Sequence, residues 1–145
     1  MKKCLALDLG DAWTGIAISD ALCIVARPYT TVATKEVETA LAKILAQEAV
    51  DTIVVGYPKT MKGLESNQTK KVIAQKELLE KKFPTVTWLF WDERLSSKRA
   101  DAVRVAQGKK QATKEEKLLG HARAAAFILD SYLSSKIAIL SDEEM

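Results

Sequence analysis

Two short apolar segments near the start of the chain, separated by only four residues, constrain the fold most. They span residues 4–9 (CLALDL) and 14–19 (TGIAIS), and the link between them contains Gly10. Runs of this length with so short a connection predict two antiparallel strands in a hairpin. Residues 24–32 (IVARPYTTV) are rich in β-branched side chains and predict a third strand, in which Pro28 favours an edge position.

Two amphipathic helices are predicted next, at residues 34–49 and 67–82, because apolar side chains recur there at helical spacing. Thr34 is placed to cap the first helix. In the second helix, the lysines are predicted to face solvent. The side chains predicted to face the core are those of Val72, Ile73, Leu78 and Leu79.

The complete order of elements predicts the fold class. Two buried strands are predicted at residues 51–56 and 86–91, and two more helices at 95–107 and 115–135, with a basic loop between these helices. The order is therefore β-β-β-α-β-α-β-α, with the last helical part split by the basic loop. It predicts an α/β domain with a ribonuclease H-like fold: a five-stranded mixed sheet, made of a three-strand meander plus βα units, with helices on both faces.

Length and composition indicate one globular domain. The chain has 145 residues, of which 48% are hydrophobic and 28% charged, and we expect a single domain at residues 1–140 with an acidic frayed tail at 141–145. Asp8 interrupts the first apolar stretch too early for a signal peptide, and no apolar window is long enough to span a membrane. We therefore expect a cytoplasmic protein with no membrane partner, in which Cys4 and Cys23 are reduced core residues.

Positive charge is concentrated in residues 94–123. This segment has nine Lys or Arg residues and three acidic residues, whereas the whole chain has a net charge of only +3. A basic segment on an otherwise slightly acidic body is typical of a polyanion-binding surface. A solvated, lysine-rich helix and loop is the alternative interpretation.

Two acidic residues stand at the ends of predicted strands. Asp8 lies within an apolar strand, where an ionised carboxylate is costly unless a cation or several hydrogen-bond donors satisfy it. It is either a metal ligand or a cap for the turn at Gly10. Glu93 follows the strand VTWLFW, and we choose it over Asp92 because adjacent strand residues point to opposite faces. A surface turn, with Arg94 paired to a carboxylate, is the alternative.

A loop and one histidine are further candidates. The loop at residues 56–63 carries Lys59 and Lys62 after a buried strand, and it either approaches a phosphate backbone or simply connects a strand to a helix. His121 is the only histidine and opens the last helix after Gly120. A lone histidine is more often a capping or packed residue than a ligand.

Four segments taken together resemble one protein family. They are LALDLGDAWTGIAISD, VVGYPKTMKG, WDERLSS and ARAAAFILDSYL, in matching order and spacing from residue 5 to about residue 133. The chain is thereby similar to the YqgF family, ribonuclease H-like proteins described as Holliday junction resolvases and as pre-16S ribosomal RNA nucleases. The resemblance implies the same fold as the order of elements.

The resemblance also implies a metal site built from Asp8, Glu93 and a third residue at the start of the last helix. Family members usually have Asp at the third position, where this chain has His121. Asp130 cannot replace it, because it lies about 180° around the helix. Imidazole is a softer ligand than carboxylate, so the site is expected to favour Mn²⁺, to bind one ion more weakly, or to use His121 as a proton donor.

The leading hypothesis is a nuclease that depends on Mg²⁺ or Mn²⁺ and processes the 5′ end of pre-16S rRNA. Its catalytic and metal-binding residues would be Asp8, Glu93 and His121. Contacts to phosphates of a structured RNA are expected, mainly without base specificity. The residues expected to make them are Lys59, Lys62, Arg94, Lys98, Arg99, Lys109 and Lys110.

Two alternatives stay open at this stage. One is a Holliday junction resolvase acting on branched DNA, which would need two active sites and hence a dimer. The other is a nucleic-acid-binding ribosome-assembly factor with weak or lost catalysis. We expect a monomer or a weak homodimer.

Overall fold

The computed structural model describes residues 2–57, 67–92 and 113–144, with side chains of the last segment described as far as residue 136. The strands are β1 Lys3–Leu9, β2 Trp13–Ser19, β3 Ala26–Ala33, β4 Val50–Tyr57 and β5 Thr87–Asp92. The helices are η1 Thr34–Glu36, α1 Val37–Gln47, α2 Asn67–Lys82 and α4 Lys114–Glu144. This order confirms the predicted meander and the alternating segments that follow it.

Two predictions stay predictions: the helix at residues 95–107 and the tail at residues 141–145. The helix predicted at residues 95–107 lies outside the described residues. Helix α4 continues through residues 141–144, which the sequence analysis assigned to a tail, and the division into one domain plus a tail stays a prediction. Within the described residues, no helix is long and apolar enough to cross a membrane.

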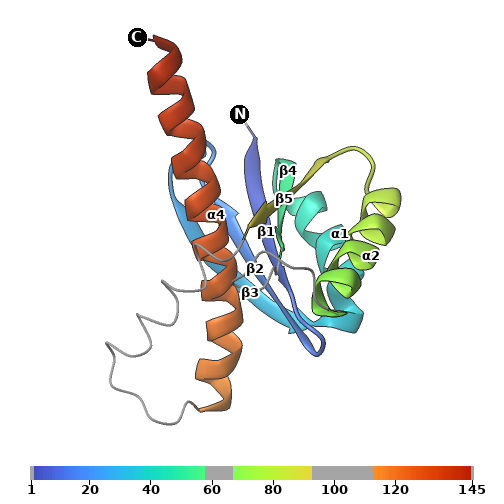
Figure 1. The fold of residues 1–145 in the computed structure, drawn as a ribbon. Helices are drawn as coiled ribbons and strands as arrows, with labels where there is room; N and C mark the ends of the chain where they lie inside the picture. Colours follow the sequence, from blue (N-terminus) through green and yellow to red (C-terminus); the bar gives the residue numbers. More distant parts are fainter. Residues whose placement is uncertain (1, 58–66, 93–112, 145) are drawn as a thin grey trace.

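The five strands form one mixed sheet in the order β3-β2-β1-β4-β5. Strands β1, β2 and β3 pair antiparallel, whereas β4 runs parallel to β1 and β5 parallel to β4. Helices α1 and α2 cover one face of the sheet and α4 crosses the other (Figure 1). Strand β3 is an edge strand, as Pro28 predicted, and the ladder to β2 shifts register just before the pairing of Ala17 with Pro28.

The alternation of β1 separates the two faces of the sheet. Leu5, Leu7 and Leu9 pack with the apolar side chains of α1 and α2, and we call this side the aliphatic face. Cys4 and Ala6 pack with α4 on the other side, the α4 face. Since alternate strand residues share a face, Asp8 belongs to the α4 face.

Thr34 does not cap α1, contrary to prediction. Its hydroxyl instead donates to the Gly10 carbonyl at 2.7 Å and lies 2.9 Å from the Thr14 hydroxyl. Neither η1 nor α1 has a side-chain hydrogen bond at its N-cap. A contact between distant segments therefore took precedence over a local cap that the sequence allowed.

The bounds of α2 are as predicted, but its inward face is different. Thr69, Val72, Lys76 and Leu79 are buried, whereas Leu78 is 60% exposed. The Lys76 ammonium lies 4.6 Å from the centre of the Phe90 ring and 3.5 Å from a Glu80 carboxylate oxygen. These contacts compensate its burial, and the long aliphatic stem of lysine packs like an apolar side chain.

Strand β5 is less buried than predicted because it forms the second edge of the sheet. Trp88 is buried in the aliphatic core, but Phe90 is 38% exposed. The ring of Phe90 lies 5.1 Å from that of Tyr57 on the neighbouring strand. An edge strand with one neighbour leaves some of its apolar side chains partly uncovered.

Both cysteines are free thiols, as expected. Cys4 is buried beneath α4, and its sulfur lies 3.6 Å from that of the partly exposed Cys23. Burial and the contact with Cys23 raise the pKa of the Cys4 thiol to about 12. Cys4 is therefore a packed, protonated core residue, whereas Cys23 lies at the margin of the core.

Candidate active site

Asp8 lies in the middle of the sheet, with glycine on the strands to either side. It pairs with Gly15 of β2, and Gly56 of β4 follows Val55, which pairs with Leu7 in the parallel ladder. Neither glycine has a side chain that could cover the carboxylate. The carboxylate therefore lies on the α4 face, with no side chain on its β2 partner to cover it.

Helix α4 rests directly on Gly15. A Cβ atom at this position would collide with the His121 carbonyl group and would lie 2.8 Å from the Ala122 nitrogen. Only glycine allows two backbones to approach so closely. Because Gly15 is the partner of Asp8, this contact brings His121 beside the carboxylate.

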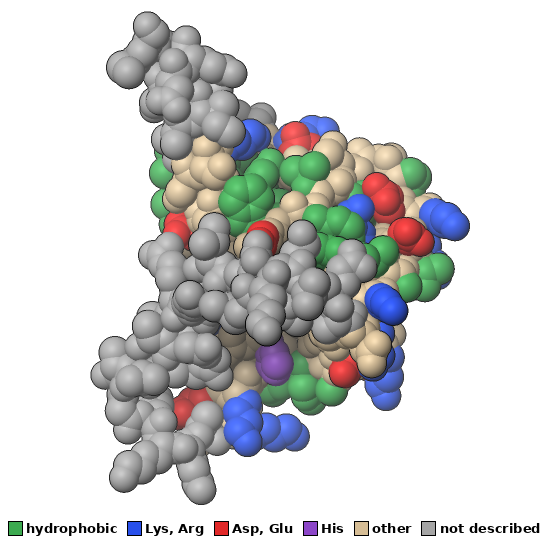
Figure 2. Space-filling model, viewed as in Figure 1, with side chains coloured by type: hydrophobic (Ala, Val, Ile, Leu, Met, Phe, Trp, Pro, Cys, Tyr) green, Lys and Arg blue, Asp and Glu red, His purple; other side chains and the backbone are tan. Residues whose placement is uncertain are grey.

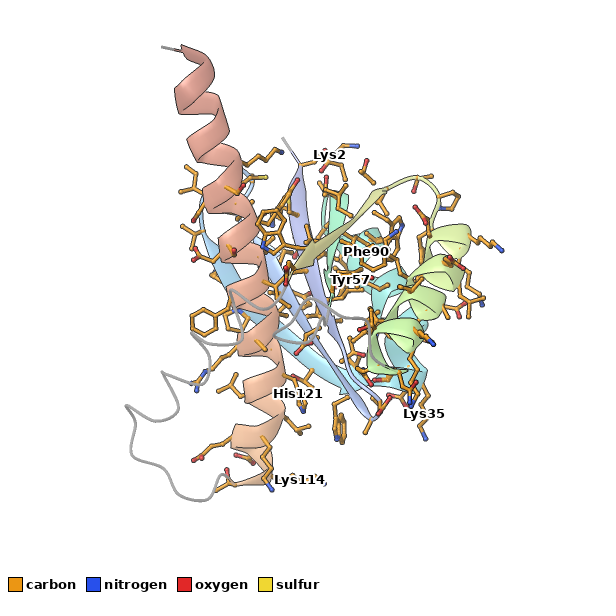
Figure 3. All side chains as sticks on the ribbon, viewed as in Figure 1. Lys2, Lys35, Tyr57, Phe90, Lys114 and His121 are labelled. Atoms are coloured by element: carbon orange, nitrogen blue, oxygen red, sulfur yellow. The ribbon has the colours of Figure 1, made fainter. Side chains whose placement is uncertain are left out.

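The electrostatics of Asp8 agree with that placement. Burial raises the pKa of the carboxyl group, and the charge of His121 acts in the opposite direction by stabilising the carboxylate. Figure 3 shows the His121 side chain on the side of α4 that faces the strands. A partly buried carboxylate beside an imidazole can bind a divalent cation or exchange a proton with its neighbour.

Several hydrogen bonds hold the backbone around Asp8. The Thr34 backbone N–H donates to the Ala12 carbonyl at 2.9 Å, and the Gly10 N–H donates to the Trp13 carbonyl at 3.1 Å. The Gln68 side-chain amide donates to the Leu9 carbonyl at 3.3 Å, which connects the start of α2 to the end of β1. The β1–β2 turn is therefore attached to both η1 and α2.

The end of β5 is also anchored to α4. The Trp91 indole N–H donates to the Ser131 hydroxyl at 3.0 Å, and the Trp91 ring lies 5.6 Å from that of Tyr132 in an edge-to-face arrangement. Trp91 thus lies on the α4 face. By strand alternation Asp92 lies on the aliphatic face, where its neighbour Phe90 contacts Tyr57.

Of the predicted catalytic residues, the structure brings Asp8 and His121 together. Within residues 2–57, 67–92 and 113–144, no group of three His, Cys, Asp or Glu side chains could hold a metal ion. The third candidate and the predicted phosphate contacts lie outside the described residues. These are Glu93, Lys59, Lys62, Arg94, Lys98, Arg99, Lys109 and Lys110.

Helix α4 begins at Lys114, close to the predicted start at residue 115. His121 therefore does not open the helix, contrary to prediction, but lies about two turns inside it. The actual start is capped by Thr113, whose hydroxyl accepts the Glu116 backbone N–H at 3.1 Å. Gly120 suggested a helix start, but it is accommodated inside the helix.

Asp20 has a structural role. Its carboxylate accepts backbone N–H groups of Leu22 at 3.3 Å and of Ile24 and Val25 at 2.8 Å each. These hydrogen bonds lower the pKa of the Asp20 carboxyl group, with those from Val25 and Ile24 contributing most. Asp20 organises the β2–β3 turn and lies at the opposite end of β2 from the residues that surround Asp8.

Sequence reasoning missed the importance of Gly15. A glycine inside an apolar strand often marks a close approach of another backbone, so a signal was present. The sequence does not say which segment approaches. The structure identifies it as the turn of α4 that carries His121.

Comparison with solved structures shows the fold. The chain matches RuvC from T. thermophilus in complex with a Holliday junction substrate with a TM-score of 0.57 and 14% identity, over 94% of this chain and 96% of that one. It matches the fowlpox virus resolvase, in complex with Holliday junction DNA, with a TM-score of 0.54 and 14% identity, over 92% and 97%. The predicted ribonuclease H-like fold is confirmed.

Comparison of sequences identifies relatives along almost the whole chain. A protein from Phocaeicola vulgatus is 36% identical over 94% of this chain and 98% of its own length. One from Rubrobacter xylanophilus is 36% identical over 88% and 89%. Both carry the name "Putative pre-16S rRNA nuclease".

A family model gives the same result. The model of the RuvX family, described as Holliday junction resolvase, matches residues 2–135. This range includes β1 with Asp8, the end of β5 and the turn of α4 that bears His121. The chain therefore belongs to the RuvX family, also called YqgF, and is a member of a family of nucleases.

Proposed function

We propose that this protein is a divalent-metal-dependent nuclease that processes the 5′ end of pre-16S rRNA, with its active site at Asp8. The observation that carries the proposal is the partly buried Asp8 carboxylate, placed under His121 by the contact of α4 with Gly15. The names of the relatives support the choice of substrate.

The environment of Asp8 fits a bound cation. Burial disfavours its ionised form, and its β2 partner, Gly15, has no side chain that could donate a hydrogen bond to it. A cation next to such a carboxylate compensates the loss of solvation. When bound, divalent ions activate a water molecule for attack on a phosphodiester and stabilise the leaving oxygen.

Glu93 is the proposed second ligand. Trp91 lies on the α4 face and Asp92 on the aliphatic face, so strand alternation disfavours Asp92 as a partner of Asp8. This supports the choice of Glu93 that the sequence suggested. In this proposal Asp8 of β1 and Glu93, which follows β5 in the sequence, would hold the ion.

His121 is the proposed third group of the site. As a ligand, its imidazole favours Mn²⁺ over Mg²⁺, since Mg²⁺ prefers oxygen. As a proton donor, it can protonate the leaving oxygen, since histidine is a common general acid in enzymes. The two roles differ in the expected effect of replacing His121 by Asp.

Exposed cations lie near the candidate site. Lys114, Lys117 and Arg123 of α4 are exposed, and Figure 2 shows Lys or Arg side chains beside the histidine. Such side chains neutralise phosphates without reading the base sequence. We propose that they act together with the predicted lysines and arginines of residues 59–62 and 94–110.

The test is cleavage of a precursor 16S rRNA fragment with Mg²⁺ or Mn²⁺. We expect cleavage by the native protein and its loss, by at least about a hundredfold, in Asp8→Asn and in EDTA. Asp51→Asn is the matched control, because Asp51 is an exposed aspartate at the other end of the sheet. Native protein without activity under either metal would refute the proposal.

His121→Asp separates the two proposed roles of the histidine. If His121 is a ligand, the variant should cleave better with Mg²⁺ than the native protein does. If His121 donates a proton, the variant should be slower with both metals and should lose the native pH dependence.

A junction resolvase is the second candidate, supported by the description of the family model. A four-way DNA junction should be included in the same assay. Symmetric cuts in two strands would favour this activity, and they require a dimer with two active sites. Binding without cleavage, insensitive to EDTA and to Asp8→Asn, would instead favour an assembly factor.

A further inference from the structure

The three tryptophans of the chain have different environments. Trp88 is 7% exposed and its indole N–H donates to the Phe83 carbonyl at 3.0 Å. The indole of Trp91 donates to Ser131, as described above. Trp13 is 36% exposed, and it makes no side-chain hydrogen bond or ring contact with any other described residue.

We infer that the exposed Trp13 ring is a stacking site for an unpaired nucleobase of the substrate strand, next to the phosphate group that would be cleaved at Asp8. This inference rests on the proposed nuclease function. It adds a ligand class, an unstacked base in a single-stranded segment, to a site so far described only by its carboxylate, its imidazole and its cations.

The backbone that carries Trp13 is held in place. Its carbonyl accepts the Gly10 N–H at 3.1 Å, and a Cβ atom at Gly10 would lie 2.5 Å from that oxygen. The preceding carbonyl, that of Ala12, accepts the Thr34 N–H, and the Thr34 hydroxyl donates to the Gly10 carbonyl. A ring on a fixed backbone loses little conformational entropy on binding, which favours affinity.

Trp13 lies on the same face as Asp8. A Cβ atom on Gly15 would point toward His121, so the Gly15 position belongs to the α4 face. Trp13 lies two residues before Gly15 on β2. Its side chain therefore has the same orientation by strand alternation. Two residues of a strand span about 7 Å, so a base on Trp13 would lie within one or two nucleotides of a phosphate at Asp8.

The surrounding charge fits a nucleic acid strand. Lys35 and Lys114, both exposed, lie at the same end of the molecule as His121 (Figure 3). An aromatic ring among cations is the usual arrangement for binding single strands: the bases stack while the cations neutralise the backbone. Stacking is tolerant of base identity, so the site distinguishes single strands from duplexes rather than one sequence from another.

The experiment measures binding separately from cleavage. Fluorescence anisotropy of a labelled single-stranded RNA would be followed in EDTA with the native protein, Trp13→Ala and Trp13→Phe. We expect about tenfold weaker binding for Trp13→Ala and near-native binding for Trp13→Phe, because the aromatic plane is retained. A fully paired duplex of the same sequence should bind the three proteins alike.

An abasic scan locates the stacked base. One abasic position should weaken binding by the native protein about as much as Trp13→Ala does, and should have no further effect in that variant. A single-stranded DNA of the same sequence should show the same loss, since the ring contacts the base and not the sugar. Equal binding by native protein and Trp13→Ala, or an abasic scan without any sensitive position, would overturn the inference.

Failure of the stacking inference can be distinguished from failure of the proposed nuclease function. Cleavage that depends on Asp8 with no effect of Trp13→Ala on binding would refute the stacking site alone. Binding that depends on Trp13 without cleavage under either metal would support the stacking site and refute the nuclease function. Urea denaturation of Trp13→Ala should first show that the variant is folded.

Discussion

The two faces of the sheet are built from side chains of different size. On the aliphatic face, Leu5, Leu7 and Ile16 are fully buried against α1 and α2. On the α4 face, the same strands present Cys4, Ala6 and Ala17. Large side chains supply most of the apolar area that stabilises the fold, whereas small ones let a helix approach the sheet closely.

This difference explains where the candidate active site can form. Asp8 continues the row of small residues on the α4 face, and its neighbour Gly15 has no side chain at all. A large residue at either place would hold α4 away from β1 and β2. The α4 face therefore buries less apolar side-chain area, and the close approach of α4 places His121 near the Asp8 carboxylate.

The largest expected effect on stability is on the aliphatic face. Leu7→Ala removes a fully buried side chain and should reduce the free energy of unfolding by about 2–5 kcal/mol. Cys4→Ala, on the α4 face of the same strand, is the matched variant and should cost about 1 kcal/mol. Urea denaturation of both would test the comparison, and a larger loss for Cys4→Ala would contradict it.

On the α4 face, adding a side-chain atom should reduce stability, whereas removing one should have only a mild effect. Gly15→Ala would force α4 away from β2 and should reduce the free energy of unfolding by about 1–3 kcal/mol, with a loss of cleavage as His121 is displaced. Gly120→Ala is the control, because a Cβ there meets nothing within 4 Å. That control should be neutral or stabilising, since alanine favours helix.

The candidate active-site carboxylate should itself reduce the stability of the metal-free protein. Burial raises the folded-state pKa of Asp8 above its ordinary value of 3.8, so folding is favoured by protonation. Stability should then fall as the pH rises above about 4. Asp8→Asn should remove this dependence and resist urea better than the native protein near neutral pH, in EDTA.

A native protein and Asp8→Asn of equal stability at every pH would contradict that expectation. Cleavage gives the complementary measurement, because the same substitution should abolish activity. A variant that is more stable and inactive is the result expected when a residue is retained for function.

The smallest effect is expected at Asp20, whose pKa is shifted in the opposite direction. Hydrogen bonds from Val25 and Ile24 lower its folded-state pKa below 3.8, so its ionised form stabilises the β2–β3 turn. That contribution is present above about pH 4 and is lost as the pH falls through the lowered pKa. Asp20→Asn should lower the thermal midpoint slightly near neutral pH and not at about pH 2.

Thermal midpoints of the native protein, Asp20→Asn and the exposed control Asp51→Asn, measured across this pH range, would test the prediction. A loss that is larger in acid than at neutral pH would contradict it. Together, the two tests would show that the contributions of Asp8 and Asp20 to stability, near opposite ends of one hairpin, depend on pH in opposite directions.

Prediction from the sequence succeeded where the pattern is local. The bounds of α2 were predicted correctly because the helical period is clear and Pro84 follows the helix closely. The orientation of α2 was only partly predicted. Hydrophobicity favours Leu78 over Lys76 as a core residue, but Lys76 is the one that reaches Phe90 and Glu80.

Prediction of the site was similarly divided. A carboxylate within an apolar strand identified Asp8, and a departure from the family pattern drew attention to His121. The family resemblance implied that the two residues share a site, but the pattern of residues did not show which backbone contact brings them together. Trp13 carried no sequence signal, since an aromatic residue at the start of a strand is usually part of the core.

The sequence by itself determined the order of the strands and helices and the fold class, because these depend on periodicity over a few residues. Only the tertiary structure decided how the two faces of β1 are covered, that α4 meets the sheet at Gly15 and that Trp13 is exposed. The physical reason is that contacts between distant segments depend on packing across the whole sheet, where the absence of one side chain sets the distance between two backbones.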